Sequence, residues 1–271
     1  MPSYLITGVS RGLGFEFLRQ LSANADNIII GIVRDKATTD KKIADELSSP
    51  SNVTILQADV GNYEALKATV STVAEVTGGS LDYLIANAAY VPDWDSYDPI
   101  GVLAQKPQEL EEEILKLTKI NVVSVIHLIS LYMPLILKGT AKKVIGITSG
   151  HADAEAVRQF DLGVSAGYAI SKASLNMVMA KFSAQYREQG VLFLALSPGV
   201  VEVGHHKDAN QQQQAALWDL AKKFMAFAPD FRGPSTPDVA CKAVVNVWES
   251  CSIEKGNGGA FLSHHGDKNW L

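Results

Sequence analysis

Short runs of apolar, mostly β-branched residues alternate along the chain with longer stretches in which apolar residues recur at helical spacing. This alternation is typical of repeated βαβ units, which build a parallel sheet covered by helices on both faces. We therefore expect a doubly wound α/β architecture with a seven-stranded parallel sheet. The strands are expected at residues 4–7, 28–33, 53–57, 83–86, 143–148, 191–197 and 259–262.

The helical stretches between these runs have apolar residues three or four positions apart, so each can cover the sheet with one face. They are expected at residues 12–23, 40–47, 63–77, 107–137, 167–189 and 237–250. No repeat or Pro/Gly-rich linker divides the 271 residues, and single hydrophobic cores stop growing near this size. Residues 1–271 are thus expected to form one domain.

One segment interrupts the alternation. Residues 204–235 lie between a predicted strand and the last helix, and residues 211–227 within them have helical spacing. Ligands of open α/β sheets bind outside the carboxyl ends of the strands, and this segment starts just after such an end. We interpret residues 204–235 as a lid that holds a substrate under Trp218 and Phe224. The apolar stripe of this lid consists of Leu217, Trp218, Leu220, Phe224, Met225 and Phe227.

The charge balance excludes one class of function. The chain has 24 Lys and Arg against 29 Asp and Glu, a net charge of -5, and no basic block that could neutralise a phosphate backbone. We expect no nucleic-acid partner. We also expect no membrane association, because the longest apolar stretch, residues 122–137, is shorter than a bilayer span and fits a buried helix.

Cysteine and histidine usage indicates a compartment and argues against a metal. Cys241 and Cys251 lie outside any CxxC or Cys/His ligand pattern, so we interpret them as reduced core thiols. Reduced thiols, and an N-terminus without a secretory pattern, indicate a cytoplasmic protein. The histidine pairs at 205–206 and 264–265 have no acidic or Cys ligand to complete a set, and we expect no metal.

The junction between the first strand and the first helix carries three glycines, Gly8, Gly12 and Gly14. Glycines there let the backbone turn tightly and approach a pyrophosphate, while the helix N-terminus offers free N–H groups and the positive end of its dipole. The spacing Gly-x-x-x-Gly-x-Gly differs from the Gly-x-Gly-x-x-Gly of most dinucleotide-binding folds. Its place between strand and helix nevertheless indicates a phosphate-bearing cofactor.

The end of the second strand should contact the adenosine ribose of such a cofactor. Arg34 at this end, together with Arg11 in the glycine turn, would pair with a 2′-phosphate and favours NADP(H). Asp35 could instead accept hydrogen bonds from a free 2′-hydroxyl if the strand ends one residue later. NADP(H) is therefore the preferred cofactor, with NAD(H) as the alternative.

Tyr168 and Lys172 lie four residues apart and so share one helix face. A positive charge fixed beside a phenol stabilises the phenolate and lowers its pKa from about 10, which suits acid/base catalysis. A second pair with this spacing, Tyr63 and Lys67, is interpreted as a surface pair. Tyr168 differs because the preceding strand ends next to Ser149, where a cofactor should bind.

Together these features resemble the short-chain dehydrogenase/reductase family over almost the whole chain. The stretch from Thr7 to Gly14 is similar to that family's TGxxxGxG motif, and Asn121 to the helix Asn that completes its catalytic tetrad. Further similar stretches are Asp59-Val60, Ala86-Asn87-Ala88-Ala89, Ser197-Pro198-Gly199, and the residues from Gly258 to Trp270, which look like a carbonyl-reductase-like branch. The resemblance implies a Rossmann-like fold and an NADP(H)-dependent oxidoreductase.

The resemblance also implies a role for each site residue. Tyr168 would exchange a proton with the substrate oxygen, and Lys172 would hold the nicotinamide ribose and lower the pKa of the phenol. Ser149 would hydrogen-bond the carbonyl oxygen, and Asn121 would anchor a water relay to Lys172. The implied cofactor-binding residues are Gly8, Ser10, Arg11, Gly12, Leu13, Gly14, Arg34, Asp59, Val60, Asn87, Ala88, Tyr168, Lys172, Pro198, Gly199 and Val201.

The chain departs from the family pattern in three places. More residues separate Ser149 from Tyr168 than the family usually has, so residues 150–167 should bulge as an extended loop beside the substrate. Val203 stands where the family commonly has Thr, which weakens one contact to the nicotinamide carboxamide. Ala89 replaces a turn Gly and affects only the local backbone geometry.

The sequence thus predicts an NADP(H)-dependent enzyme that reduces a ketone or aldehyde, or oxidises the corresponding alcohol, of a mid-sized apolar small molecule. Two alternatives stay open: a reductase of C=C or C=N bonds on the same scaffold, and a non-catalytic NADP(H)-sensing binding protein. The apolar helix at residues 122–137 and the Tyr168 helix could also form a subunit interface, which would give a homodimer or homotetramer.

Overall fold

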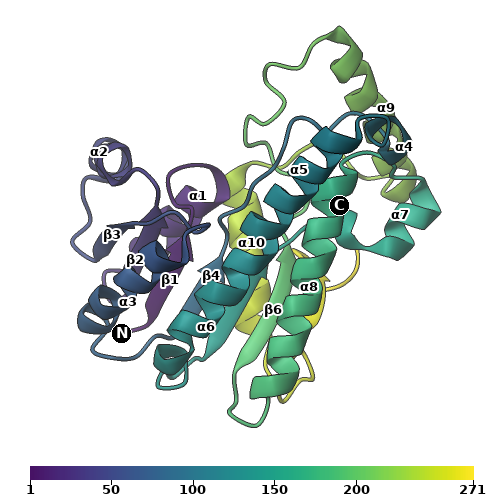
Figure 1. The fold of residues 1–271 in the computed structure, drawn as a ribbon. Coiled ribbons are helices and arrows are strands. Elements are labelled where there is room, and N and C mark those ends of the chain that lie inside the picture. Colours follow the sequence, from purple (N-terminus) through teal and green to yellow (C-terminus); the bar gives the residue numbers. More distant parts are fainter.

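The computed structural model describes residues 1–271 and is built on one parallel sheet with the strand order β3-β2-β1-β4-β5-β6-β7 (Figure 1). Every neighbouring pair of strands runs parallel, which confirms the predicted seven-stranded doubly wound sheet. The predicted strand limits hold to within one residue at each end. The strands are β1 (Ser3–Thr7), β2 (Ile28–Val33), β3 (Val53–Gln57), β4 (Tyr83–Ala86), β5 (Lys143–Ile147), β6 (Leu192–Ser197) and β7 (Ala260–Ser263).

The strand order reverses between β1 and β4. The chain starts at a central strand, proceeds outward to β3, and then returns to pair β4 with the other side of β1. In open parallel sheets, the carboxyl ends of the two strands at such a reversal bound the crevice that binds ligands. The glycine turn after β1 and the turn after β4 both lie at this crevice.

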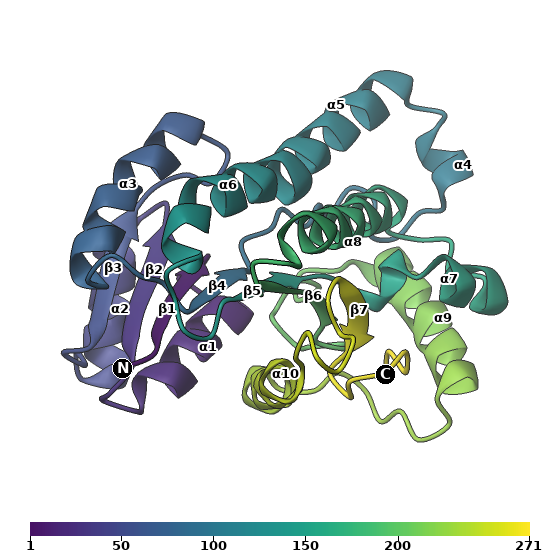
Figure 2. The ribbon, with the colours of Figure 1, turned by 90° about the horizontal axis from the view of Figure 1, so that it is seen from below.

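Helices cover both faces of the sheet, as Figure 2 shows. On one face α1 and α10 bury Phe17, Leu18 and Trp248 against the sheet. On the other face α3, α6 and α8 form a second core that contains Tyr132 and Met179. The long helices are α1 (Gly12–Ser22), α2 (Lys36–Leu47), α3 (Tyr63–Val76), α8 (Ala166–Tyr186), α9 (Gln211–Phe227) and α10 (Pro237–Ser250).

The helix predicted at residues 107–137 is one long rod with a change of winding in its middle. It consists of α5 (Pro107–Thr118), a π-helical turn η1 (Lys119–Val123) and α6 (Ser124–Ile136). The rod is long and apolar enough to cross a membrane by length and composition alone. Here α6 buries Leu128, Ile129 and Tyr132 in the core against the sheet, as the predicted buried helix requires.

Two sequence expectations about local structure are wrong. Helix α2 begins at Lys36 rather than at residue 40, because the carboxylate of Asp35 caps its N-terminus. Residues 150–167 are not an extended loop: they contain the turn η2 (Gly150–Ala152) and the helix α7 (Ala154–Phe160). Asp153 starts α7 by accepting hydrogen bonds from two backbone N–H groups of its first turn. The short helix α4 (Ile100–Leu103) was not predicted either.

The lid helix and the thiols agree with the sequence predictions. Helix α9 spans the predicted residues and begins with a capping box between Asn210 and Gln213. Cys241 on α10 and Cys251 at its C-terminus are unpaired and buried in the core. Burial raises the pKa of both thiols, which keeps them protonated and unreactive.

Candidate active site

The glycine turn after β1 has a backbone that only glycine fits. Gly8 and Gly12 have φ of +78° and +57°, in the left-handed region that favours glycine. At Gly14 a Cβ atom would lie 2.2 Å from the carbonyl oxygen of Gly8. No side chain caps the N-terminus of α1, so its first N–H groups are free for an anion. The turn therefore fits the phosphate-bearing cofactor predicted from the sequence.

The turn after β4 is tied directly to β1. The Thr7 hydroxyl oxygen accepts hydrogen bonds from the backbone N–H groups of Asn87 and Ala88 at 3.1 and 3.0 Å. The Asn87 amide donates in return to the Thr7 carbonyl at 2.9 Å. A Cβ atom at Gly8 would lie 3.0 Å from the Cα of Ala88, so the two turns are packed closely. The structure thus brings the predicted residues of both turns together at the crevice.

Two arginines and one hydrogen-bonded carboxylate lie where the adenosine ribose of a cofactor was expected, at the end of β2 and in the glycine turn. Arg11 and Arg34 are exposed, and neither forms an ion pair. Asp35 accepts hydrogen bonds from the Thr38 hydroxyl at 2.6 Å and from the Thr38 backbone N–H at 3.0 Å. These bonds, with the hydroxyl bond the larger cause, hold the pKa of Asp35 below its ordinary value. Both oxygens of Asp35 are thus used to cap α2.

Lys172 is buried on α8 and directed at β5. Its ammonium donates a hydrogen bond to the Ile147 carbonyl at 2.8 Å, and burial lowers its pKa to about 8. The Lys172 nitrogen lies 5.6 Å from the centre of the Tyr168 ring. The pair therefore shares one helix face at the carboxyl end of β5, as predicted.

The expected lowering of the Tyr168 pKa by Lys172 is wrong. Burial, the larger cause, and the negative charge of Asp95 together raise the pKa of Tyr168 to about 12. The ammonium of Lys172 is turned toward the Ile147 carbonyl, so the loss of hydration of the phenolate dominates. The Tyr168 phenol is therefore protonated at neutral pH and available as a proton donor.

Asn121 joins the turn after β4 to the catalytic helix. Its side-chain oxygen accepts from the Tyr90 backbone N–H at 2.8 Å, and its amide donates to the Tyr90 carbonyl at 2.9 Å and the Ser171 hydroxyl at 3.0 Å. Both amide protons are occupied in this way. The predicted relay from Asn121 to Lys172 cannot begin at these protons, and the side chain positions α8 and the turn.

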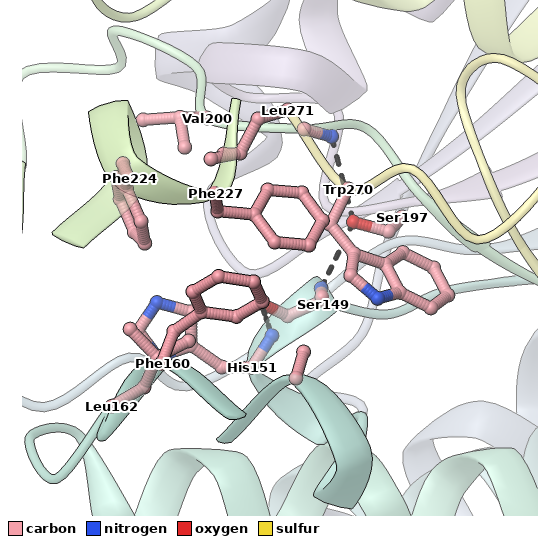
Figure 3. A pocket seen from close by; sticks show the side chains of 13 residues that line it. Ser149, His151, Phe160, Leu162, Ser197, Val200, Phe224, Phe227, Trp270 and Leu271 are labelled. Carbon is pink, nitrogen blue, oxygen red and sulfur yellow. Dashed lines mark hydrogen bonds between the residues drawn. The ribbon is translucent and has the colours of Figure 1, made fainter. Parts of the chain in front are cut away.

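Ser149 lies at the carboxyl end of β5 and lines a pocket (Figure 3). Its hydroxyl oxygen accepts a hydrogen bond from the His151 backbone N–H at 3.3 Å. No hydrogen bond joins Ser149 to the Tyr168 phenol, which does not line this pocket. The two residues come from adjacent elements, since Lys172 of α8 is bonded to the end of β5. The residues lining the pocket are Ser149, Gly150, His151, Ala156, Phe160, Leu162, Ser197, Gly199, Val200, Phe224, Phe227, Trp270 and Leu271.

Of the two residues predicted to cover the substrate, Phe224 lines the pocket and Trp218 does not. Phe224 is buried and faces His151 edge-on, with 5.9 Å between the ring centres. Trp218 is 60% exposed and does not line the pocket, which contradicts its predicted role. The reason is helical geometry: six residues at about 100° each place the two side chains on different faces.

Several residues of the site were missed by the sequence reasoning. Asp95, which follows β4, is buried and contacts the first turn of α8. Trp270 and Leu271 return from the end of the chain to the pocket beside Ser149. The aromatic composition of the C-terminal stretch was the only available signal for Trp270. Asp95 belongs to no motif.

The turn after β6 completes the crevice. Gly199 has a φ of +79°, and a Cβ atom there would lie 2.7 Å from the imidazole ring of His264. Val201 pairs with Ser235 in an isolated parallel bridge, which anchors the base of the segment that carries α9. Val203 lies beside the glycine turn, 3.6 Å from the position of a Cβ at Gly12.

Comparison with known proteins extends these observations. The family model described as short chain dehydrogenase matches residues 3–214. Short chain dehydrogenase virK of Hypocrea virens is 54% identical, and short-chain dehydrogenase/reductase iacC of Pestalotiopsis fici 46% identical, each over 100% of both chains.

Solved structures have the same fold. The NADPH-bound carbonyl reductase from chicken fatty liver aligns over 98% of both chains with a TM-score of 0.78 and 23% identity. Carbonyl reductase Sniffer of D. melanogaster aligns over 98% of both chains with a TM-score of 0.76 and 22% identity. Since the family model covers most of the chain and two relatives match its full length, this chain belongs to the short-chain dehydrogenase/reductase family of NAD(P)(H)-using oxidoreductases.

Proposed function

We propose that this protein is an NADP(H)-dependent reductase of a ketone or aldehyde, able to oxidise the corresponding alcohol in reverse. The observation that carries the proposal is the pair of partly buried Tyr168 and fully buried Lys172 at the carboxyl end of β5. Burial keeps the phenol protonated, and a protonated phenol is the form that a carbonyl reduction needs. The proposed substrate pocket is lined by Ser149, which follows the same end of β5.

The residues at the crevice fit a dinucleotide phosphate. The glycine turn and the N-terminus of α1 suit the pyrophosphate, and Arg11 and Arg34 are free to pair with a 2′-phosphate. Asp35 is engaged in capping α2, which removes the main argument for NAD(H). When bound, the reduced nicotinamide supplies the hydride that adds to the substrate carbon. The residues proposed to hold the cofactor are Gly8, Ser10, Arg11, Gly12, Leu13, Gly14, Arg34, Asp59, Val60, Asn87, Ala88, Tyr168, Lys172, Pro198, Gly199 and Val201.

The chain's own residues carry the proton and the charge. Tyr168 donates its phenolic proton to the carbonyl oxygen, and Ser149 donates a hydrogen bond to the same oxygen as negative charge develops there. Lys172 donates one proton to the Ile147 carbonyl, and its other ammonium protons would hold the cofactor ribose. Asn121 keeps the helix of Tyr168 in register with the turn after β4.

The proposal is tested by following oxidation of NADPH and of NADH with a panel of ketones, aldehydes, enones and imines, and by identifying the products. We expect alcohols as products and a higher kcat/KM with NADPH. Products saturated at C=C or C=N would show a different reductase. Tight NADPH binding without turnover of any compound would show a non-catalytic binding protein.

We also propose that the protein self-associates, as a homodimer or homotetramer, through the helices α5, α6 and α8. Four large apolar side chains on these helices are exposed, namely Leu115, Ile126, Ile170 and Met177. Exposed large apolar side chains on the helices of the proposed interface are the observation that supports it. A mass from light scattering equal to one chain would contradict this proposal.

A further inference from the structure

The pocket beside Ser149 has aromatic walls from three separate parts of the chain. Phe160 of α7 meets Phe227 of α9 edge to face, with ring centres 4.6 Å apart and an interplanar angle of 89°. Trp270 is buried and stacks on Phe261 of β7 at 4.3 Å. Figure 3 shows the rings of Phe160, Phe227 and Trp270 around Ser149. Walls of this kind bind flat aromatic rings well, because ring faces and edges attract one another in fixed orientations.

One wall of the pocket is held firmly in place. Trp270 packs so closely on the backbone of η2 that a Cβ atom at Gly150 would lie 2.7 Å from the Trp270 Cβ. The indole thus has no room to retreat on that side. An aromatic wall that cannot shift favours a flat aromatic ligand over a puckered saturated one.

One polar side chain in the pocket makes no hydrogen bond. The Ser197 hydroxyl oxygen already accepts from the backbone N–H of Gly150 at 3.0 Å. The imidazole of His151, in contrast, makes no hydrogen bond and contacts the edge of Phe224. Burial lowers the pKa of His151, so the ring is neutral at neutral pH and offers one donor and one acceptor. A neutral imidazole in an apolar pocket is suited to recognise one oxygen of a ligand.

We propose that the substrate is an aromatic ketone with a ring hydroxyl, in which Ser149 binds the carbonyl oxygen and His151 binds the hydroxyl. This inference rests on the proposed carbonyl reduction. In that reaction the carbonyl carbon gains a hydride from NADPH and the oxygen gains the proton of Tyr168, which gives an alcohol and NADP⁺. The ring hydroxyl is unchanged and serves only for recognition. His151 is therefore a residue that determines specificity.

The first experiment compares three kinds of ketone as substrates of the wild-type enzyme with NADPH. They are 1-decalone, 1-tetralone, and the four ring-hydroxylated 1-tetralones. We expect at least tenfold higher kcat/KM for 1-tetralone than for the saturated 1-decalone, and at least a further tenfold for one hydroxylated isomer. Equal rates for aromatic and saturated ketones would overturn the inference while leaving carbonyl reduction intact. No NADPH oxidation with any carbonyl compound would instead contradict the proposed function.

The second experiment assigns the discrimination to His151. In His151→Phe, the ratio of kcat/KM for the preferred hydroxylated isomer to kcat/KM for 1-tetralone should fall at least tenfold, to about one. His127→Phe, a histidine replacement on α6 away from the pocket, should leave both values unchanged. Retention of the preference in His151→Phe would overturn the assignment. Thermal unfolding and NADPH binding of each variant distinguish a recognition effect from a folding defect.

Discussion

The carboxylate of Asp95 accepts a hydrogen bond from the backbone N–H of Tyr168 at 2.8 Å, so a buried anion holds the first turn of the helix that carries the proposed proton donor. Ser165, at the start of α8, has a φ of 56° and makes no side-chain cap. Asp95 supplies that cap from a distant loop, and its backbone carbonyl also accepts from the Ser165 N–H at 2.8 Å. One residue thus fixes the position of Tyr168 and raises the pKa of its phenol.

Replacing Asp95 by Asn is expected to shift the pH dependence of alcohol oxidation to lower pH. The amide oxygen can still accept from the Tyr168 N–H, but the negative charge that disfavours the phenolate is gone. The pKa of Tyr168 then falls, because one of the two causes that raise it is removed. The pH profile of kcat for oxidation of an alcohol measures this shift.

A matched variant checks that charge near Tyr168 is the cause. Asp98→Asn removes an exposed carboxylate of the same loop and should leave the profile unchanged. A profile of Asp95→Asn that coincides with wild type would show that Asp95 has only a structural role.

The sequence predicts those parts of the fold and site that depend on near neighbours in the chain. Strand limits are correct to within one residue because each buried strand is a continuous apolar run between polar turns. Tyr168 and Lys172 share a face because four residues complete about one helical turn. Asp95 was missed because its partner is 73 residues away and no local pattern connects them.

Other failures have the same origin. The pKa of Tyr168 depends on burial, which no spacing of residues reveals, so the sequence predicts its direction wrongly. The choice between Trp218 and Phe224 depends on how α9 is rotated against α7, a packing detail set by Phe160 and Phe227. The residue types of the site could be predicted from the sequence, whereas the burial and orientation of their side chains depend on tertiary packing.

Replacing Tyr168 by Phe is expected to lower kcat for carbonyl reduction by roughly 10²- to 10⁴-fold, which is what a positioned proton donor contributes. NADPH affinity should change by less than about threefold, since the ring and Lys172 remain. Product formation in stopped assays measures kcat, and a titration followed by NADPH fluorescence measures the affinity for the cofactor. Tyr63→Phe, in the second pair with the same spacing, serves as the control and should behave as wild type. Turnover near the wild-type rate in Tyr168→Phe would refute the proposed proton donor.

Replacing Arg34 by Ala is expected to raise the KM for NADPH at least tenfold and to leave the KM for NADH within about twofold. The guanidinium is exposed and forms no ion pair within the chain, so its removal should weaken only the binding of a cofactor that carries a 2′-phosphate. Arg11→Ala should act in the same direction. Since the attraction is between charges in water, the NADPH preference should also weaken at high salt. Equal changes in KM for both cofactors would remove the argument for a 2′-phosphate site.

Replacing Lys172 by Met is expected to abolish turnover and at the same time to stabilise the protein without cofactor at neutral pH. Burial depresses the pKa of Lys172 from 10.5 to about 8, so between these values the unfolded chain binds more protons than the folded one. Stability contributed by this residue therefore rises with pH through that window and is lowest below pH 8. The shift corresponds to a cost on the order of 3 kcal/mol at pH 7, which the lost hydrogen bond to Ile147 partly offsets.

Denaturant unfolding at pH 7 and pH 10 measures the difference in stability between Lys172→Met and the wild-type protein. Lys172→Met should be the more stable protein at pH 7, and its advantage should shrink toward pH 10. A constant or growing advantage over that range would mean that the buried ammonium is not the source of the cost.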